Sequence, residues 1–235
     1  MIFGVIVAGG VGSRMGANMP KQFLDLNGRP IIMHTLQAFL DCAELDQIYM
    51  GVHPEWVEYM DELICKHIAV EAQRRVHLVP GGAERNDTIM NVIAQIEVDY
   101  GTEEIHYIIT QDGVRPFVSQ RLIKEHIEAV VQYDAVNTAI PAVDTIMVSR
   151  DGLVIDEIPE RKYLYQVQTP QSFRMDLLKN LYVQLSEDEK KILTDACKIC
   201  TVRNVPVRFV IGDVTNMKIT TTADFEIAKI IAKQL

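Results

Sequence analysis

The sequence predicts an α/β fold in which helices flank a mostly parallel central sheet and a β-arm protrudes. Short apolar runs of strand length alternate along the chain with segments whose apolar residues recur at helical spacing. This alternation stops at 141–168 and resumes at Ser172. The 235 residues contain no internal repeat, low-complexity tract or linker, so we expect one domain, 1–235, with 141–168 as the arm.

The strands and helices follow from the spacing of apolar residues. Segments that begin at Leu36, Ile89 and Ile123 repeat apolar residues at helical intervals, which predicts helices with one buried face. A last helix is expected at 222–234, where Thr221 and Asp224 have the spacing of a capping pair. The apolar runs expected to form strands are 2–8, 46–52, 75–80, 105–110, 135–140 and 207–211.

The composition excludes several classes of protein. A net charge of -9 and a pI near 5.2 argue against binding to nucleic acid or to an anionic membrane surface. No apolar stretch has the length of a membrane span, and the N-terminus lacks the basic region of a signal peptide. We therefore expect a cytoplasmic protein in which any phosphate chemistry uses locally concentrated cations.

The first strand leads into a glycine-rich stretch, 7–16, which is followed by Pro20-Lys21-Gln22. Glycines allow a tight turn that brings backbone N–H groups against a ligand, and Arg14 and Lys21 place two cations just beyond it. The spacing matches neither the P-loop nor the dinucleotide-binding pattern. The stretch predicts a polyphosphate site, whereas a lone glycine-rich turn is also common as plain structure.

Two later segments follow strands and carry polar residues. In 81–88, paired glycines precede a helix whose N-terminus can meet an anion; alternatively, Asn86 or Asp87 merely caps that helix. Asp112 lies at the end of the 105–110 strand, where open α/β sheets bind ligands, and its carboxylate suits Mg²⁺. The alternative for Asp112 is a structural ion pair with Arg115.

Other polar residues are less informative by themselves. Arg161 lies on the arm and Lys218 just before the last helix, and each alone is typical of a solvated surface cation. Cys197 and Cys200 have Cys-x-x-Cys spacing without a second pair or nearby histidines, so we expect buried thiols and no zinc or redox site.

Taken in order, the motifs resemble the cytidylyltransferases that make CDP-alditols, a family that includes methylerythritol-phosphate and ribitol-5-phosphate cytidylyltransferases. The resemblance covers nearly the whole chain. The matching motifs are Ala-Gly-Gly-x-Gly-x-Arg-Met at 8–15, Pro-Lys-Gln at 20–22, Gly-Gly-x-x-Arg at 81–85, Asp-x-x-Arg-Pro at 112–116, Thr-Pro-Gln at 169–171 and Lys-Ile-Thr at 218–220.

The resemblance implies a Rossmann-like nucleotide-diphospho-sugar transferase fold and a reaction in which an alditol phosphate attacks the α-phosphorus of CTP, with release of pyrophosphate. It implies that Arg14 and Lys21 stabilise the pentavalent α-phosphate, and that Arg161 and Lys218 orient the alditol phosphate. Mg²⁺ is expected to bridge the triphosphate near Asp112. The residues expected to bind CTP and substrate are Val7, Ala8, Gly9, Gly10, Gly82, Ala83, Glu84, Arg85, Asn86, Asp87, Thr88, Asp112 and Thr145.

The resemblance also implies partners. In the family the arm crosses to a second subunit, so Arg161 and Thr145 are expected to serve the neighbour's site in a homodimer; a plain surface hairpin is the alternative. Association with a ribulose-phosphate reductase that supplies the acceptor is a further hypothesis.

Three alternative functions remain for the chain: a sugar-1-phosphate nucleotidyltransferase, an inactive nucleotide-binding module and a cysteine-based zinc or redox protein.

Four segments favour D-ribitol 5-phosphate, the precursor of CDP-ribitol in teichoic acid synthesis, over 2-C-methyl-D-erythritol 4-phosphate of isoprenoid synthesis. The methylerythritol branch more often has Ala-Arg-Pro at the strand end and Thr-Asp-Glu-Ala later. The segments that resemble the ribitol-phosphate enzymes are Val-Arg-Pro-Phe at 114–117, Val-Asp-Thr-Ile at 143–146, Leu-Tyr-Gln at 164–166 and Leu-Thr-Asp-Ala-Cys-Lys at 193–198.

Overall fold

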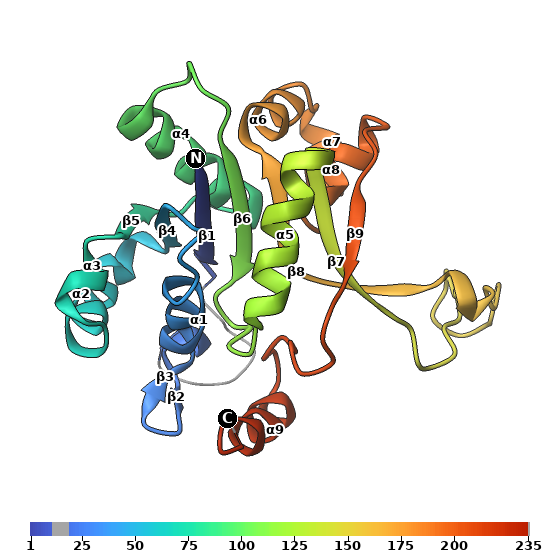
Figure 1. Cartoon of the computed structure of the whole chain (residues 1–235). Coiled ribbons are helices and arrows are strands. Elements are labelled where there is room, and N and C mark those ends of the chain that lie inside the picture. Colours follow the sequence, from blue (N-terminus) through green and yellow to red (C-terminus); the bar gives the residue numbers. More distant parts are fainter. Residues whose placement is uncertain (11–18, 235) are drawn as a thin grey trace.

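The computed structural model describes residues 1–10 and 19–234, and within them a seven-stranded sheet forms the centre of the molecule (Figure 1). Its strand order is β5-β4-β1-β6-β8-β7-β9, and neighbouring strands run parallel except where β8 pairs antiparallel with β6 and β7. The predicted α/β class with a mostly parallel sheet is confirmed. The strands are β1 (Ile2–Ala8), β4 (Gln47–Val52), β5 (Val76–Pro80), β6 (Tyr107–Asp112), β7 (Ala135–Pro141), β8 (Tyr165–Arg174) and β9 (Arg208–Ile211).

Helices cover both faces of the sheet because alternate residues of its strands are apolar on both sides. In β1, Ile6 packs in one buried cluster with α1, α2 and α5, whereas Phe3 and Val5 pack in a second cluster with α4, α6 and α8. The helices are α1 (Ile31–Leu40), α2 (Val57–His67), α3 (Val70–Gln73), α4 (Arg85–Tyr100), α5 (Gln120–Tyr133), α6 (Met175–Val183), α7 (Glu187–Lys191), α8 (Cys197–Val202) and α9 (Thr222–Ile231).

The last helix, α9, packs apart from the sheet, against a small apolar cluster that includes Leu26 and Ile219. Leu26 belongs to a short hairpin of β2 (Asp25–Leu26) and β3 (Arg29–Pro30). The expected cap of α9 is present: the Thr221 hydroxyl accepts the Asp224 N–H, and the Asp224 carboxylate accepts the Thr221 N–H. The helix therefore starts where its capping pair predicts.

The sequence did not predict β8. Its ten residues alternate little and include Gln168, Thr169, Gln171 and Ser172, all of them buried. Polar side chains are tolerated inside a sheet only when hydrogen bonds satisfy them. Here the partners come from other elements; the Gln171 side chain, for example, donates from Nε2 to Asn137 Oδ1 of β7 at 3.1 Å. A pattern of apolar residues cannot reveal a strand that tertiary hydrogen bonds stabilise.

Several expected boundaries also differ, and α9, for example, ends at Ile231 and not at 234. β6 begins and ends two residues later than the 105–110 run, so Asp112 is its last residue and pairs in register with Val7 of β1. The arm leaves the sheet after β7 and returns at Tyr165 (Figure 1). Residues 165–168, expected in the arm, belong to β8 because their backbone pairs with β7. The projecting part, residues 142–164, holds one antiparallel bridge, Val148 with Glu157.

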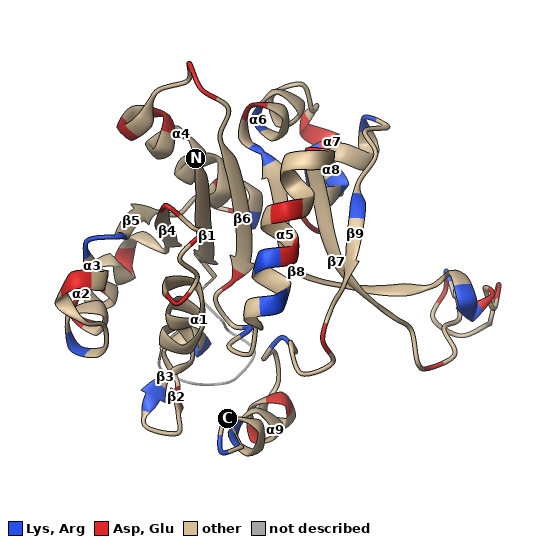
Figure 2. Cartoon of the chain, viewed as in Figure 1, with Lys and Arg blue, Asp and Glu red and all other residues tan. Residues whose placement is uncertain are grey.

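Charged residues of both signs are interspersed over the helices and loops (Figure 2).

A buried histidine joins α5 to β7 and β8. His126 is fully buried, its Nε2 lies 2.8 Å from the Thr138 hydroxyl, and its Nδ1 pairs with the Ser172 hydroxyl. The Thr138 hydroxyl donates its proton to the Pro170 carbonyl, so it accepts from Nε2–H, and Nδ1 accepts from Ser172. The ring is therefore neutral, and burial lowers the pKa of His126 to about 3.

This pKa makes stability depend on pH. Because the folded value lies below the 6.5 of an ordinary histidine, the unfolded chain binds more protons between these values, and lowering the pH favours unfolding. We expect His126 to account for a loss of about 2 kcal/mol in the free energy of unfolding between pH 7 and pH 5. Urea unfolding at both pH values measures it. In His126→Gln the loss between the two pH values should be smaller by that amount, and equal losses in the two proteins would contradict the assignment.

Candidate functional site

A cavity of about 480 Å³ opens at the carboxyl ends of the parallel strands. The ends of β1, β4, β5 and β6 lie side by side at this edge, since Ala8 pairs with Val52, Val52 with Pro80, and Val7 with Asp112. Open α/β sheets bind ligands at this edge. The predicted site residues that line the cavity are Val7, Ala8, Gly9, Gly10, Lys21, Gly82, Ala83, Glu84, Arg85, Thr88, Asp112 and Lys218.

The first wall of the cavity is the backbone that follows β1. The buried Gln22 side chain holds it in place, because Nε2 donates to the carbonyls of Ala8 at 3.1 Å and Gly10 at 2.9 Å. Gly9 is required by space, since a Cβ there would lie 2.9 Å from the Thr88 hydroxyl. This role of Gln22 could not be expected from the sequence, where its signal is its place beside Lys21 in Pro-Lys-Gln.

The second wall is the stretch 82–88, which opens α4. Glu84 is the N-cap, rather than Asn86 or Asp87 as in the alternative interpretation: its side chain and that of Asp87 exchange hydrogen bonds with each other's backbone N–H. The Thr88 hydroxyl accepts the Gly82 N–H and donates to the Glu84 carbonyl, both at 3.1 Å. The positive end of the α4 dipole therefore lies at the cavity, which favours an anion there.

Asn86 and Asp87 are not brought to this cavity. Asn86 is buried, and both residues line a second cavity on the other side of the stretch, next to Tyr182. The physical reason is the helical turn, which sends successive side chains in different directions: Thr88 faces the first cavity, whereas Asn86 and Asp87 face the second.

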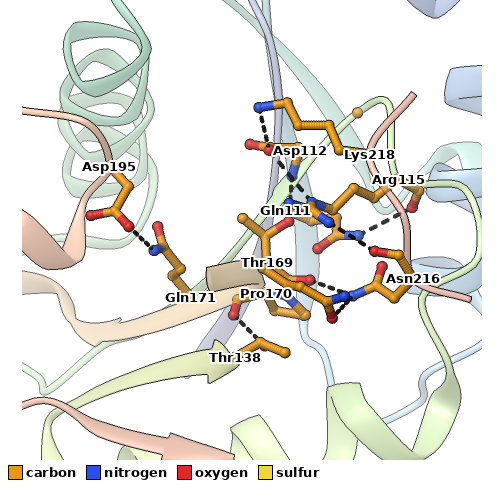
Figure 3. Close-up of polar contacts among 12 residues, drawn as sticks. Gln111, Asp112, Arg115, Thr138, Thr169, Pro170, Gln171, Asp195, Asn216 and Lys218 are labelled. Atoms are coloured by element: carbon orange, nitrogen blue, oxygen red, sulfur yellow. Dashed lines mark hydrogen bonds and ion pairs between the residues drawn. The ribbon is translucent and has the colours of Figure 1, made fainter. Parts of the chain in front are cut away.

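The third wall carries a concentrated positive charge around one carboxylate (Figure 3). The Asp112 oxygens lie 3.0 Å from Arg85 Nε, 2.9 Å from Lys218 Nζ and 3.7 Å from Arg115 Nε. Burial by itself would raise the pKa of Asp112, but these three cations lower it below its ordinary value. One ionised carboxylate with three cations leaves an excess of two positive charges. The predicted Asp112–Arg115 pair is thus present, within a larger cluster.

Arg85 retains capacity for an anion. Its Nε donates to Asp112, while its two Nη atoms are buried and find no hydrogen-bond acceptor among the described residues. A buried guanidinium with unpaired donors is costly unless a ligand supplies acceptors. Phosphate oxygens are such acceptors.

Lys218 is held in place by a network that the sequence analysis missed (Figure 3). The fully buried Asn216 donates from Nδ2 to the Thr169 carbonyl at 2.7 Å, and its own carbonyl accepts from Arg115 Nη1 at 2.8 Å. Thr169 in turn accepts the Asp112 N–H through its hydroxyl at 3.1 Å. Asn216 lies just before the Lys-Ile-Thr segment, but a single sequence offers no sign that it links three elements.

The remaining predicted residues lie elsewhere. Arg161 and Thr145 are exposed on the arm, and Arg161 donates from Nη1 to the Val143 carbonyl at 2.9 Å, so neither lines the cavity. Arg14 lies outside the described residues.

The cavity fits a cation that arrives with a polyphosphate better than a resident metal. Among the described residues, no three His, Cys, Asp or Glu side chains form a metal-binding group. Asp112 offers carboxylate oxygens at the cavity, and Mg²⁺ commonly binds through one or two carboxylates together with substrate phosphates. Asp112 and Glu84 are the two carboxylates among the described residues that line the cavity, and Asp112 is the one expected from the sequence to hold Mg²⁺.

The cysteines agree with the expectation of buried thiols. Cys197 and Cys200 are free and buried in α8, and burial raises the pKa of Cys200 to about 11. A thiol with so high a pKa is a poor nucleophile.

None of the described helices combines the length and the apolar character needed to cross a membrane.

Comparison with known proteins adds an independent finding. Residues 2–234 match the family model described as IspD, 2-C-methyl-D-erythritol 4-phosphate cytidylyltransferase. A 4-diphosphocytidyl-2C-methyl-D-erythritol synthase from Anaerococcus prevotii is 25% identical, with 99% of this chain and 98% of that chain covered and a TM-score of 0.81.

Two further solved structures are similar. A 2-C-methyl-D-erythritol 4-phosphate cytidylyltransferase from Thermus thermophilus is 24% identical over 99% of this chain and 100% of its own, with a TM-score of 0.73. The corresponding enzyme from Francisella tularensis is 23% identical over 97% and 98%, with a TM-score of 0.78. These two likenesses support the fold.

Proposed function

Since the chain belongs to the IspD family of CTP-dependent cytidylyltransferases, we propose that it transfers the cytidylyl group of CTP to the phosphate of an alditol phosphate and releases pyrophosphate. The observation that carries this proposal is the cavity itself. Two backbone segments and a helix N-terminus meet an excess of cations there, in a chain whose net charge is -9.

The chemistry needs no covalent intermediate with the enzyme. An oxygen of the acceptor phosphate forms a bond to the α-phosphorus of CTP, and the bond from that phosphorus to the bridging oxygen of pyrophosphate breaks. The protein contributes position and positive charge where negative charge grows. Lys21 lines the cavity and is proposed, with Arg14, to stabilise the α-phosphate in the transition state.

The residues around Asp112 have two proposed roles. Lys218 orients the acceptor phosphate, for which it must exchange its contact with Asp112 for one with the substrate. Asp112 would hold Mg²⁺ together with the triphosphate, and the ion would neutralise negative charge there. The backbone of 7–10 and 82–85, with Thr88, cradles the nucleotide.

The arm is proposed to complete a second subunit's site in a homodimer. Arg161 and Thr145 lie on the projecting segment, which extends away from the sheet and its helices (Figure 1). No residue of this segment lines the cavity. The projecting segment also exposes apolar side chains such as Leu153 and Val154, which are 90% and 64% exposed. Such exposed apolar surface is typical of an interaction site.

For the acceptor, the comparisons support 2-C-methyl-D-erythritol 4-phosphate better than D-ribitol 5-phosphate, because the family model and the similar structures carry that description. The ribitol preference expected from the sequence is not confirmed. D-Ribitol 5-phosphate remains a second candidate on one specific ground: the segments 114–117, 143–146, 164–166 and 193–198 resemble the ribitol-phosphate enzymes. Identities of 25% and below leave room for a different acceptor.

One assay tests the function and separates the acceptors. Pyrophosphate release from CTP and Mg²⁺ is measured with each of the two alditol phosphates in parallel, and we expect release that depends on an acceptor. The acceptor with the higher kcat/KM is the substrate. UTP, GTP and TTP with an aldose 1-phosphate form the control series, since faster release there would identify a sugar-1-phosphate nucleotidyltransferase instead. Binding of CTP without release for any acceptor would contradict the proposal.

A further inference from the structure

The stretch 84–87 separates two cavities. On one side lies the proposed CTP cavity, and on the other lies a second cavity of about 520 Å³ between this stretch and the α6–α7 region. Glu84 and Arg85 line both. A wall with open space on each side lacks the close packing that fixes most of the core, so its position depends on specific polar contacts.

One such contact crosses the second cavity. The Tyr182 hydroxyl on α6 donates to Asp87 Oδ1 at 2.6 Å. The other oxygen of the same carboxylate accepts the Glu84 N–H at 3.1 Å. Gly82 packs directly against Asp87, because a Cβ at Gly82 would lie 2.4 Å from the Asp87 Cβ. Through Asp87, the hydroxyl of Tyr182 therefore fixes the backbone that lines the CTP cavity.

Tyr182 is suited to this role. Its neighbours Leu178 and Leu181 on α6 are buried, and its ring packs at the edge of the same apolar cluster. The Lys190 ammonium lies over the ring at 5.3 Å from its centroid. Burial, and then the bond with Asp87, raises the pKa of Tyr182 above its ordinary value, so the phenol stays protonated and keeps donating at physiological pH.

We propose that Tyr182 is a positioning residue for CTP, which holds the 82–88 stretch in its binding conformation through Asp87 without touching the nucleotide. The inference deepens the proposed function and rests on it. It also gives Asp87, which was expected from the sequence to contact CTP, a different role. Its carboxylate faces Tyr182 and fixes the 82–88 stretch from the side of the second cavity.

Tyr182→Phe tests the proposal, because it removes the hydroxyl and keeps the ring. We expect the KM for CTP to rise about fivefold, since a hydrogen bond to a charged group is lost one step away from the ligand. The kcat and the KM for the acceptor should stay within about twofold, because Lys21 and Lys218 are not displaced. A loss of stability alone would not produce this split between the two substrates.

Tyr49→Phe is a matched control. The Tyr49 hydroxyl also donates to an aspartate of α4 at 2.6 Å, but that residue is Asp99, in the last turn of the helix and away from the cavity. Both variants remove the same kind of bond from the two ends of one helix. An unchanged KM for CTP in Tyr182→Phe, or an equal rise in both variants, would overturn the proposal.

CTP binding without acceptor, measured by calorimetry, separates failure of the inference from failure of the proposed function. If the wild type binds CTP but turns over no acceptor, the proposed function fails, and weaker CTP binding in Tyr182→Phe alone still supports the positioning role. If both variants bind CTP as the wild type does, the positioning role fails while the function stands. A wild type that binds no CTP would overturn both.

Discussion

Lys21→Ala is expected to lower kcat at least about a hundredfold with the fold intact, the magnitude that one preorganised donor to a transition state contributes. Lys21 lines the cavity just beyond the glycine-rich stretch, in a position to meet the charge that grows on the α-phosphate. An exposed surface charge contributes about 0–1 kcal/mol, which is too little for such an effect. Arg14→Ala is expected to behave in the same way if the two cations act on one phosphate.

Steady-state pyrophosphate release and circular dichroism measure this result together. Lys66→Glu is the control: Lys66 is exposed on α2, and even reversal of its charge should leave the kcat nearly unchanged. A near-wild-type kcat in Lys21→Ala would refute its assignment to the transition state and leave the cavity as a binding site only.

Asp112→Asn is expected to affect both activity and stability. The wild-type carboxylate is 9% exposed and contacts Arg85, Arg115 and Lys218, so its neutralisation leaves three neighbouring cations without a counter-charge. Removal of one partner from a buried ion pair costs about 3–5 kcal/mol of unfolding free energy. The kcat should fall about a hundredfold as well, since the variant also loses the negative charge of the ligand proposed for Mg²⁺.

Chemical unfolding and pyrophosphate release test this expectation. Asp176→Asn is a matched control, because Asp176 also pairs with an arginine, Arg174, but its side chain is 63% exposed. That exposed pair should contribute about 0–1 kcal/mol. In Asp112→Asn, tripolyphosphate without Mg²⁺ should raise the thermal midpoint more than in the wild type, since it supplies the missing negative charge. If Asp112→Asn loses no more unfolding free energy than Asp176→Asn, the ion pairs of Asp112 contribute no more than an exposed pair, and the expectation is wrong.

Much of the fold could be predicted from the sequence because the strands of a two-sided sheet are apolar on both faces. The runs at 2–8, 46–52 and 75–80 became β1, β4 and β5 with boundaries within one residue. β8 could not be predicted in this way. Its buried Gln171 and Ser172 resemble loop residues until the tertiary structure supplies their hydrogen-bond partners, Asn137 and His126.

For the candidate site, the motifs identified which segments meet but not how they are held. Gly9 and Gly10 of the glycine-rich stretch line the same cavity as Gly82, as expected, because strands that alternate with helices end at a common edge. The sequence gives no sign of what Gln22 and Asn216 do, because each donates to backbone carbonyls that come close to it only after folding.

The amino-acid sequence by itself determined the class of fold, the positions of most strands along the chain, and the clustering of glycines and cations in a chain that is otherwise acidic. These properties are local: they depend on spacing along the chain and on the chemistry of single residues. Only the tertiary structure decided that three cations share the Asp112 carboxylate and that Asp87 faces Tyr182. It alone also decided that the polar segment 165–174 forms a strand inside the sheet, β8. Most of these contacts join elements separated by dozens of residues, and their energy exists only when folding removes both partners from water.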